Sequence, residues 1–83
     1  MSEHDRDYTA KIIELANVRG VDIQCNYVST SHGRYRRFLF EADIRGRRFA
    51  KGIEIDPSLM NDENLPRLAQ SVRCAFMYAL DSI

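Results

Sequence analysis

The chain has 83 residues, of which 45% are hydrophobic and 29% charged, and its twelve basic residues balance twelve acidic ones. This length and composition are typical of one small folded domain, spanning residues 1–83, and exclude a disordered chain. No apolar run is long enough for a membrane span and the start MSEHDRD is unlike a signal peptide, so we expect a cytoplasmic protein that does not enter membranes.

The first predicted element is a helix that begins after an N-cap at Asp5 or Asp7 and is closed by Gly20. Residues 1–6 are expected to be frayed. Its buried stripe follows at helical spacing and comprises Tyr8, Ile12, Leu15, Ala16 and the stem of Arg19. A helix of about twelve residues is marginal alone, so it must pack against another element.

Three strands are predicted next. The first covers 21–28, where apolar and polar residues alternate, and the Ser/Gly-rich run 29–33 is expected to form the turn that ends it. The segment 34–51 then folds back on itself at Arg45-Gly46. Phe38, Phe40, Ala42 and Ile44 form the core-facing row of its first arm, and its second arm continues to Ile55.

The last predicted element is a helix capped by Asn64, with Pro66 tolerated in its first turn. Its apolar stripe is the longest in the chain and comprises Leu65, Leu68, Ala69, Val72, Phe76, Ala79, Leu80 and Ile83. The predicted fold is therefore α+β with αβββα order: a three-stranded antiparallel meander with both helices on one face.

The segment 34–51 is the strongest functional signal. Two acidic residues and seven of the twelve basic residues lie there, which gives it a net charge of +5 between flanks of −2 and −3. The basic residues are Arg34, Arg36, Arg37, Arg45, Arg47, Arg48 and Lys51. We expect them to form an uncovered cationic surface that contacts nucleic acid phosphates or an acidic protein. They could also be a solvated edge that discourages strand pairing.

A second candidate surface lies on the last helix. Cys74 projects almost opposite the apolar stripe, with Met77 and Tyr78 on either side, and such a patch predicts a protein contact or a homodimer. We expect both cysteines to be reduced thiols. The histidines and cysteines fit no zinc spacing and no catalytic triad, so we predict neither a metal, a cofactor nor an enzyme activity.

The order of elements and several local motifs resemble a double-stranded-RNA-binding domain. The likeness extends from about Tyr8 to Ile83. It includes the segment ELANVRG at 14–20, the loop Ser31-His32-Gly33, and the aromatic and glycine positions of the hairpin. The resemblance implies a binding module without catalysis that contacts structured or double-stranded RNA.

The resemblance also implies which residues touch RNA. Glu14 of the first helix and His32 of the loop would each enter a minor groove. The family's third contact, a lysine cluster at the start of the last helix, is missing here, because only Arg67 and Arg73 are basic in that window. We therefore expect RNA contact through the arginine hairpin, His32 and the first helix. The alternative is a small inhibitor or adaptor, of phage or mobile-element origin, that binds protein through the hairpin and the last helix.

Overall fold

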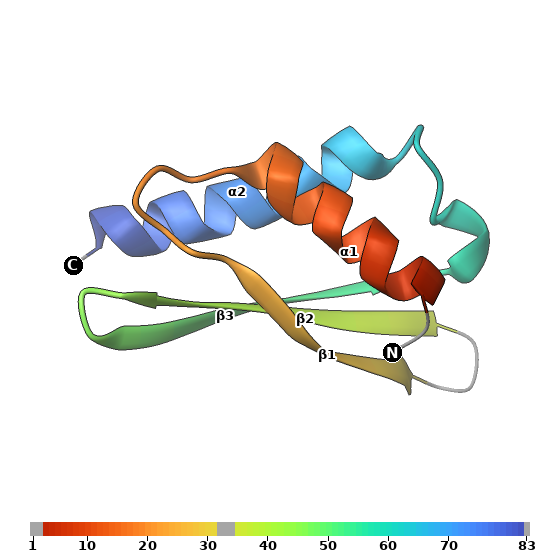
Figure 1. Ribbon diagram of the computed structural model, residues 1–83, viewed down its shortest axis with the longest axis horizontal. Helices are drawn as coiled ribbons and strands as arrows, with labels where there is room; N and C mark the ends of the chain where they lie inside the picture. Colours follow the sequence, from red (N-terminus) through yellow and green to blue (C-terminus); the bar gives the residue numbers. More distant parts are fainter. Residues whose placement is uncertain (1–2, 32–34, 83) are drawn as a thin grey trace.

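The computed structural model describes residues 3–31 and 35–82, with the backbone alone for 26–31. Helix α1 (Glu3–Ala16) is followed by strands β1 (Gln24–Ser31), β2 (Tyr35–Ile44) and β3 (Arg47–Ile55). A short 3-10 turn, η1 (Pro57–Leu59), then leads to helix α2 (Leu65–Asp81). The strands form an antiparallel sheet in the order β1-β2-β3, and both helices lie on one side of it (Figure 1). The predicted α+β, αβββα fold is confirmed.

The core lies between the helices and the inner face of the sheet. The row predicted on β2 is buried throughout, from Phe38 to Ile44. Its fully buried aromatic rings, Phe38 and Phe40, are joined by Ile12 of α1 and by Val72 and Phe76 of α2. Burying side chains of this size stabilises the fold by roughly 1.5–3 kcal/mol each, before the entropy of ordering is subtracted.

Helix α2 follows the prediction closely. The buried stripe is the predicted one, with Leu65, Ala69, Val72, Phe76 and Ala79 buried and Leu68 and Leu80 packed against the core at its sides. Asn64 occupies the N-cap position, but its side chain does not cap the helix. It donates instead to the Leu59 carbonyl and to the Asn61 side chain, which fixes the turn before α2. The end of the stripe, Ile83, is outside the described residues.

Helix α1 begins and ends earlier than its sequence predicts. It starts at Glu3, so residues 3–6 are helical rather than frayed, and neither Asp5 nor Asp7 is its N-cap. Asp5 is instead a buried member of the stripe. This stripe turns Leu15 toward solvent, where 53% of its surface is exposed. The helix ends at Ala16, and Gly20, with φ of +81°, belongs to the following turn.

Strand β1 is shifted along the chain relative to the prediction. It runs from Gln24 to Ser31, so the residues 29–31 assigned to a turn pair with β2. The register shifts between Cys25 and Tyr27, which inserts one extra residue as a bulge. A one-residue bulge reverses the alternation of faces, and the uniform period of two in 21–28 contained no sign of it. Ile23, ahead of the strand, is nevertheless buried.

Candidate functional site

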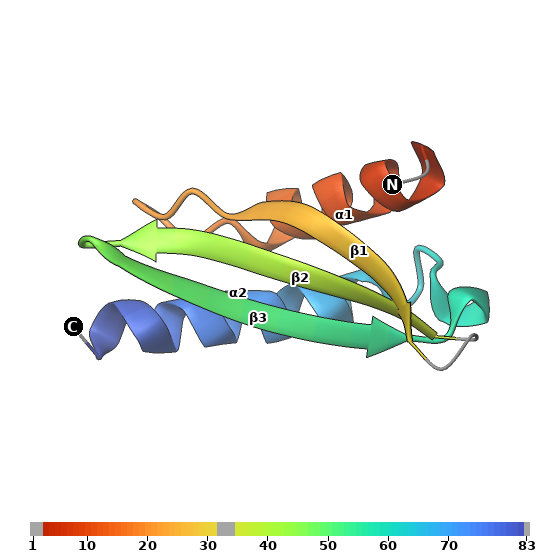
Figure 2. The same ribbon diagram turned by 90° about the horizontal axis from the view of Figure 1, so that it is seen from below.

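The basic hairpin is formed by β2 and β3, which join at the predicted position. Arg45 and Gly46 both have positive φ, +52° and +83°, and Ile44 pairs directly with Arg47. This is a two-residue type I′ turn, the type whose twist matches that of the two strands. Glycine adopts this conformation without strain, whereas an arginine does so at a cost. Figure 2 shows β2 in the middle of the sheet and β3 as one of its two edges.

Arg48 is held by two carboxylates of the neighbouring strand. Its Nε donates to Glu41 Oε2 at 3.2 Å and its Nη1 to Asp43 Oδ2 at 3.0 Å. The hydrogen bond with Glu41, followed by the charge of Asp43, raises the pKa of the Arg48 guanidinium above its ordinary value. Arg48 and Asp43 are direct cross-strand partners, so the charge of Arg48 is neutralised within the hairpin.

Arg36 has a structural role on the inner side of the sheet. It pairs with Ile55 of β3, and its Nη1 lies 3.6 Å from Oδ2 of Asp5 in α1. Asp5 is 2% exposed but the Arg36 side chain keeps 38% of its surface exposed, so this ion pair joins β2 to the first turns of α1 at the margin of the core. Neither sequence periodicity nor the resemblance indicated this contact, because the two residues are 31 positions apart.

Three other basic residues of the hairpin form no ion pair within the described chain, although Arg37 is the direct cross-strand partner of Glu54. Within the described chain, no carboxylate lies within 4 Å of Arg37, Arg47 or Lys51. The Arg37 side chain lies over Gly52, where an added Cβ would be 3.7 Å from Nε. Arg47 is exposed and Lys51 is half-buried. His32 and Arg34 lie outside the described residues, so their predicted roles stay predictions.

The predicted single cationic surface is wrong for the open face of the sheet. On the open face, the charged residues of β2 and β3 are two arginines and three carboxylates, whose charges sum to −1: Arg37, Arg48, Glu41, Asp43 and Glu54. Arg47 and Lys51 are on the opposite side, because they pair with Ile44 and Phe40 of the core-facing row. The three cations without an ion pair in the described chain therefore divide between two faces, and two of them lie on β3, an edge strand.

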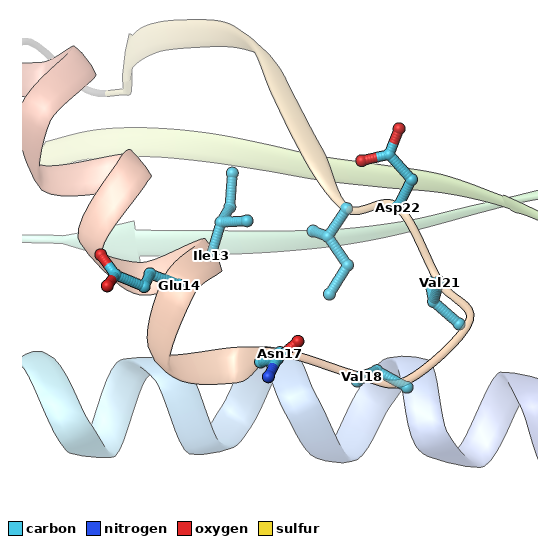
Figure 3. Close-up of a pocket in the computed structure, with 7 residues that line it drawn as sticks. Ile13, Glu14, Asn17, Val18, Val21 and Asp22 are labelled. Carbon is cyan, nitrogen blue, oxygen red and sulfur yellow. The ribbon is translucent and has the colours of Figure 1, made fainter.

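Glu14 lines a pocket of about 400 Å³ between the end of α1 and the segment that leads to β1 (Figure 3). The pocket has an apolar wall and carries Glu14 and Asp22 at its margin. Its lining residues are Ile13, Glu14, Asn17, Val18, Val21, Asp22 and Ile23. Glu14 is exposed, and Lys11 of the same helix pairs with Asp62 at 3.8 Å. No motif in the sequence indicated this pocket.

The outer face of α2 has the predicted exposed side chains. Cys74 is exposed, as are Met77 and Tyr78 with 41% and 76% of their surfaces. The amide of Gln70 donates to Cys74 Sγ at 3.3 Å, so this thiol has a neighbour on its own helix. Neither Cys74 nor Cys25 forms a disulfide within the described residues. The face is separated from the sheet by the helix itself.

Arg73 makes the contact that sequence reasoning missed. Its Nη1 donates to the carbonyl oxygens of Ala16 at 2.8 Å and Asn17 at 2.7 Å. These are carbonyls at the C-terminal end of α1, which have no partner within their own helix. One of the two basic residues in the window of the missing lysine cluster thus joins α1 to α2. The only sequence feature that pointed to this contact was the position of Arg73 beside the apolar stripe of α2.

The described residues contain no group of three or more histidine, cysteine, aspartate or glutamate side chains that could hold a metal ion. Nor does that part of the chain include a helix long and apolar enough to cross a membrane. Comparison with models of known protein families, with curated proteins and with solved structures finds no match in any of the three. The resemblance to double-stranded-RNA-binding domains therefore stays a prediction.

Proposed function

We propose that this chain is a non-enzymatic protein-interaction module that binds an acidic segment of a partner through Arg47 and Lys51. The observation that carries the proposal is the contrast within the hairpin. Arg36 and Arg48 have carboxylate partners, whereas Arg47 and Lys51 have none within 4 Å among the described residues. Both lie on β3, an edge strand to which a partner has access.

The arrangement of charge favours a protein partner over a phosphate backbone. Binding of nucleic acid depends on several cations that neutralise a row of phosphates. Here Glu41, Asp43 and Glu54 lie on the open face of the hairpin, and Asp62 and Glu63 precede α2. These carboxylates interrupt the continuous row of cations that a phosphate backbone requires. Two isolated cations, four residues apart on one strand, are better matched by a few carboxylates on a polypeptide.

The test compares matched charge removals. A fluorescein-labelled peptide of alternating glutamate and valine is titrated with wild type, Arg47→Gln and Arg67→Gln at 150 mM salt. At this ionic strength, charges more than about 8 Å apart are largely screened. Arg67 is exposed on α2, so its removal changes net charge equally. We expect Arg47→Gln to weaken binding at least threefold and Arg67→Gln to leave it unchanged. Equal effects, or no binding by wild type at low salt, would overturn the proposal.

Contact with structured RNA is the second candidate. The αβββα order favours it, because the resemblance to double-stranded-RNA-binding domains implies this order. The same titration with a short RNA duplex, a DNA duplex and a single strand separates the two functions. Duplex RNA binding that exceeds peptide binding, with a log–log salt slope of about −3 or steeper, favours RNA.

The outer face of α2 supports a further part of the proposal, a homodimer or a second docking contact. Cys74, Met77 and Tyr78 expose polarisable and aromatic surface there rather than charge. Because the sheet packs against the opposite side of α2, a contact here would leave the β3 edge accessible. A single molecule could then join two partners, as an adaptor does.

A further inference from the structure

We propose that the partner binds as a fourth strand: an extended acidic segment pairs antiparallel with the outer edge of β3. This inference rests on the proposed function and specifies its geometry. Recognition would combine backbone hydrogen bonds along the edge with carboxylates that meet Arg47 and Lys51. Three features of β3 support this pairing, namely its free backbone groups, its inner row of side chains, and the like charges that a second copy of the chain would bring together.

The free backbone groups follow from the register of the hairpin. In a two-residue turn the flanking pair, Ile44 and Arg47, is hydrogen-bonded, and such pairs alternate along an antiparallel ladder. The odd-numbered residues of β3 therefore bond to β2. The N–H and C=O groups of the even-numbered residues point outward: Arg48, Ala50, Gly52 and Glu54. All four residues are exposed, and no strand of the described chain pairs with this edge.

β3 is the more suitable of the two sheet edges. β1 has a register shift between Cys25 and Tyr27, which interrupts the regular spacing of its backbone groups. The pairing of β3 with β2 is continuous over nine residues, from Arg47 to Ile55, without a shift and without a proline. An edge of this length and regularity is a template for another strand unless it is protected.

The inner row of side chains specifies the sequence of the partner. Cations and apolar residues alternate in the order Arg47, Phe49, Lys51, Ile53. Lys51 pairs with the fully buried Phe40 and is half-buried, so its stem lies at the margin of the core, and no carboxylate of the described residues lies within 4 Å of its charge. An antiparallel strand matched to this row has the pattern apolar, any, acidic, any, apolar, any, acidic.

Helix α2 extends the apolar part of this row. It packs on β3, and Arg73 on one of its flanks bonds to α1. The flank away from α1 carries Leu68 and Ala75, which are only half-buried. By helical spacing, these two residues are on the side of the β3 edge, where an added strand would cover them. Apolar partner residues opposite Phe49 and Ile53 would then continue the core.

A second copy of the chain does not satisfy the same edge. The antiparallel register that engages all four outward residues of both copies pairs Arg48 with Glu54 and Ala50 with Gly52. It necessarily sets Lys51 directly opposite the second copy's Lys51. Like charges in direct cross-strand positions are destabilising. Arg48, which would face Glu54 of the second copy, is already bound by Glu41 and Asp43, so the repulsion between the two Lys51 residues disfavours self-association and favours an acidic strand from another protein.

The test uses the acetylated, amidated peptide Val-Thr-Glu-Thr-Val-Thr-Glu and its lysine counterpart, in which both glutamates are replaced. Gly52→Pro removes an outward N–H without removing a bond to β2, and Gly52→Ala keeps that N–H and makes only ordinary contact with Arg37. We expect Gly52→Pro to weaken the glutamate peptide at least tenfold and Gly52→Ala to leave it unchanged. Because Gly52→Pro could distort the strand, circular dichroism and Ala50→Pro, a second outward position, serve as checks.

Lys51→Glu separates this inference from the proposed function. It should weaken the glutamate peptide about threefold to tenfold, as expected when an attractive pair becomes repulsive, and should make the lysine peptide bind. If Lys51→Glu has this effect but neither folded proline variant does, the acidic contact stands and strand addition is wrong. If no variant alters affinity, both proposals fail. A dimer through the edge in wild type would also contradict the inference.

Discussion

Replacing Arg73 with methionine should destabilise the whole fold, because one guanidinium nitrogen links the two helices. Arg73 Nη1 donates to Ala16 and Asn17 at 2.8 and 2.7 Å, and the residue is half-buried. Methionine retains much of the aliphatic stem, so the change in stability reports mainly the loss of the polar contacts. Hydrogen bonds from a charged donor contribute about 1.5–3 kcal/mol. In the variant, the two carbonyl oxygens at the end of α1 lose this donor and are only partly hydrated in its place.

This loss is a large share of the total stability. A domain of this length is stable by roughly 4–12 kcal/mol, so Arg73→Met should remove between an eighth and three quarters of it. The expected fall in Tm is roughly 6–24 °C. Urea unfolding followed by circular dichroism measures the free energy of unfolding directly, provided that the m-value is unchanged.

Arg67→Met is the matched control for this experiment. Arg67 is on the same helix but exposed, and its Nη2 reaches only the Asn64 side chain, at 3.3 Å. Its replacement should change the free energy of unfolding by less than about 0.5 kcal/mol. Equal destabilisation by the two variants would refute the reasoning, since it would mean that the contact with α1 contributes nothing beyond the loss of an arginine from α2.

Three further predictions concern other parts of the fold. Tyr8 donates to the Asn61 carbonyl at 3.0 Å, and burial raises the pKa of its hydroxyl above the ordinary value of about 10. The folded state thus binds this proton more tightly, so stability should fall as pH rises above 10, and the fall should be smaller in Tyr8→Phe unfolding curves. Arg45→Asn should raise the free energy of unfolding by about 0.5–1 kcal/mol in urea titrations, because asparagine tolerates positive φ better, and unchanged stability would argue against strain there. Tyr78→Asp should leave Tm unchanged and, if α2 forms a homodimer, halve the mass measured by light scattering.

Those parts of the fold that depend on local patterns could be predicted from the sequence. The alternation in β2 and the stripe of α2 report which residues are buried, and Arg45-Gly46 specified a tight turn. The same turn also fixed the register, so the pairing of Arg48 with Asp43 could have been deduced from the sequence. The prediction of one cationic surface was wrong, because the basic residues of the hairpin lie on both faces of the sheet.

Other features depend on tertiary contacts that no local pattern contains. Asp5 is buried beside Arg36 of β2, with which it forms an ion pair. From the helix sequence alone, an aspartate near the start is expected to be only an N-cap. The bulge in β1 reverses a periodicity that looked uniform. The division of the hairpin cations between two faces follows from which residues the sheet places inward. The edge of β3 became a candidate site only once this division was known.

Residue-resolved amide hydrogen exchange of β3, followed by NMR with and without the glutamate peptide, shows whether a strand adds to this edge. In the free protein we expect slow exchange at Phe49, Lys51 and Ile53 and fast exchange at Ala50 and Gly52, because only the first set bonds to β2. Saturating peptide should slow Ala50 and Gly52 at least tenfold and leave α2 unchanged. Unchanged exchange at these two amides in the bound state would mean that the peptide does not pair with β3.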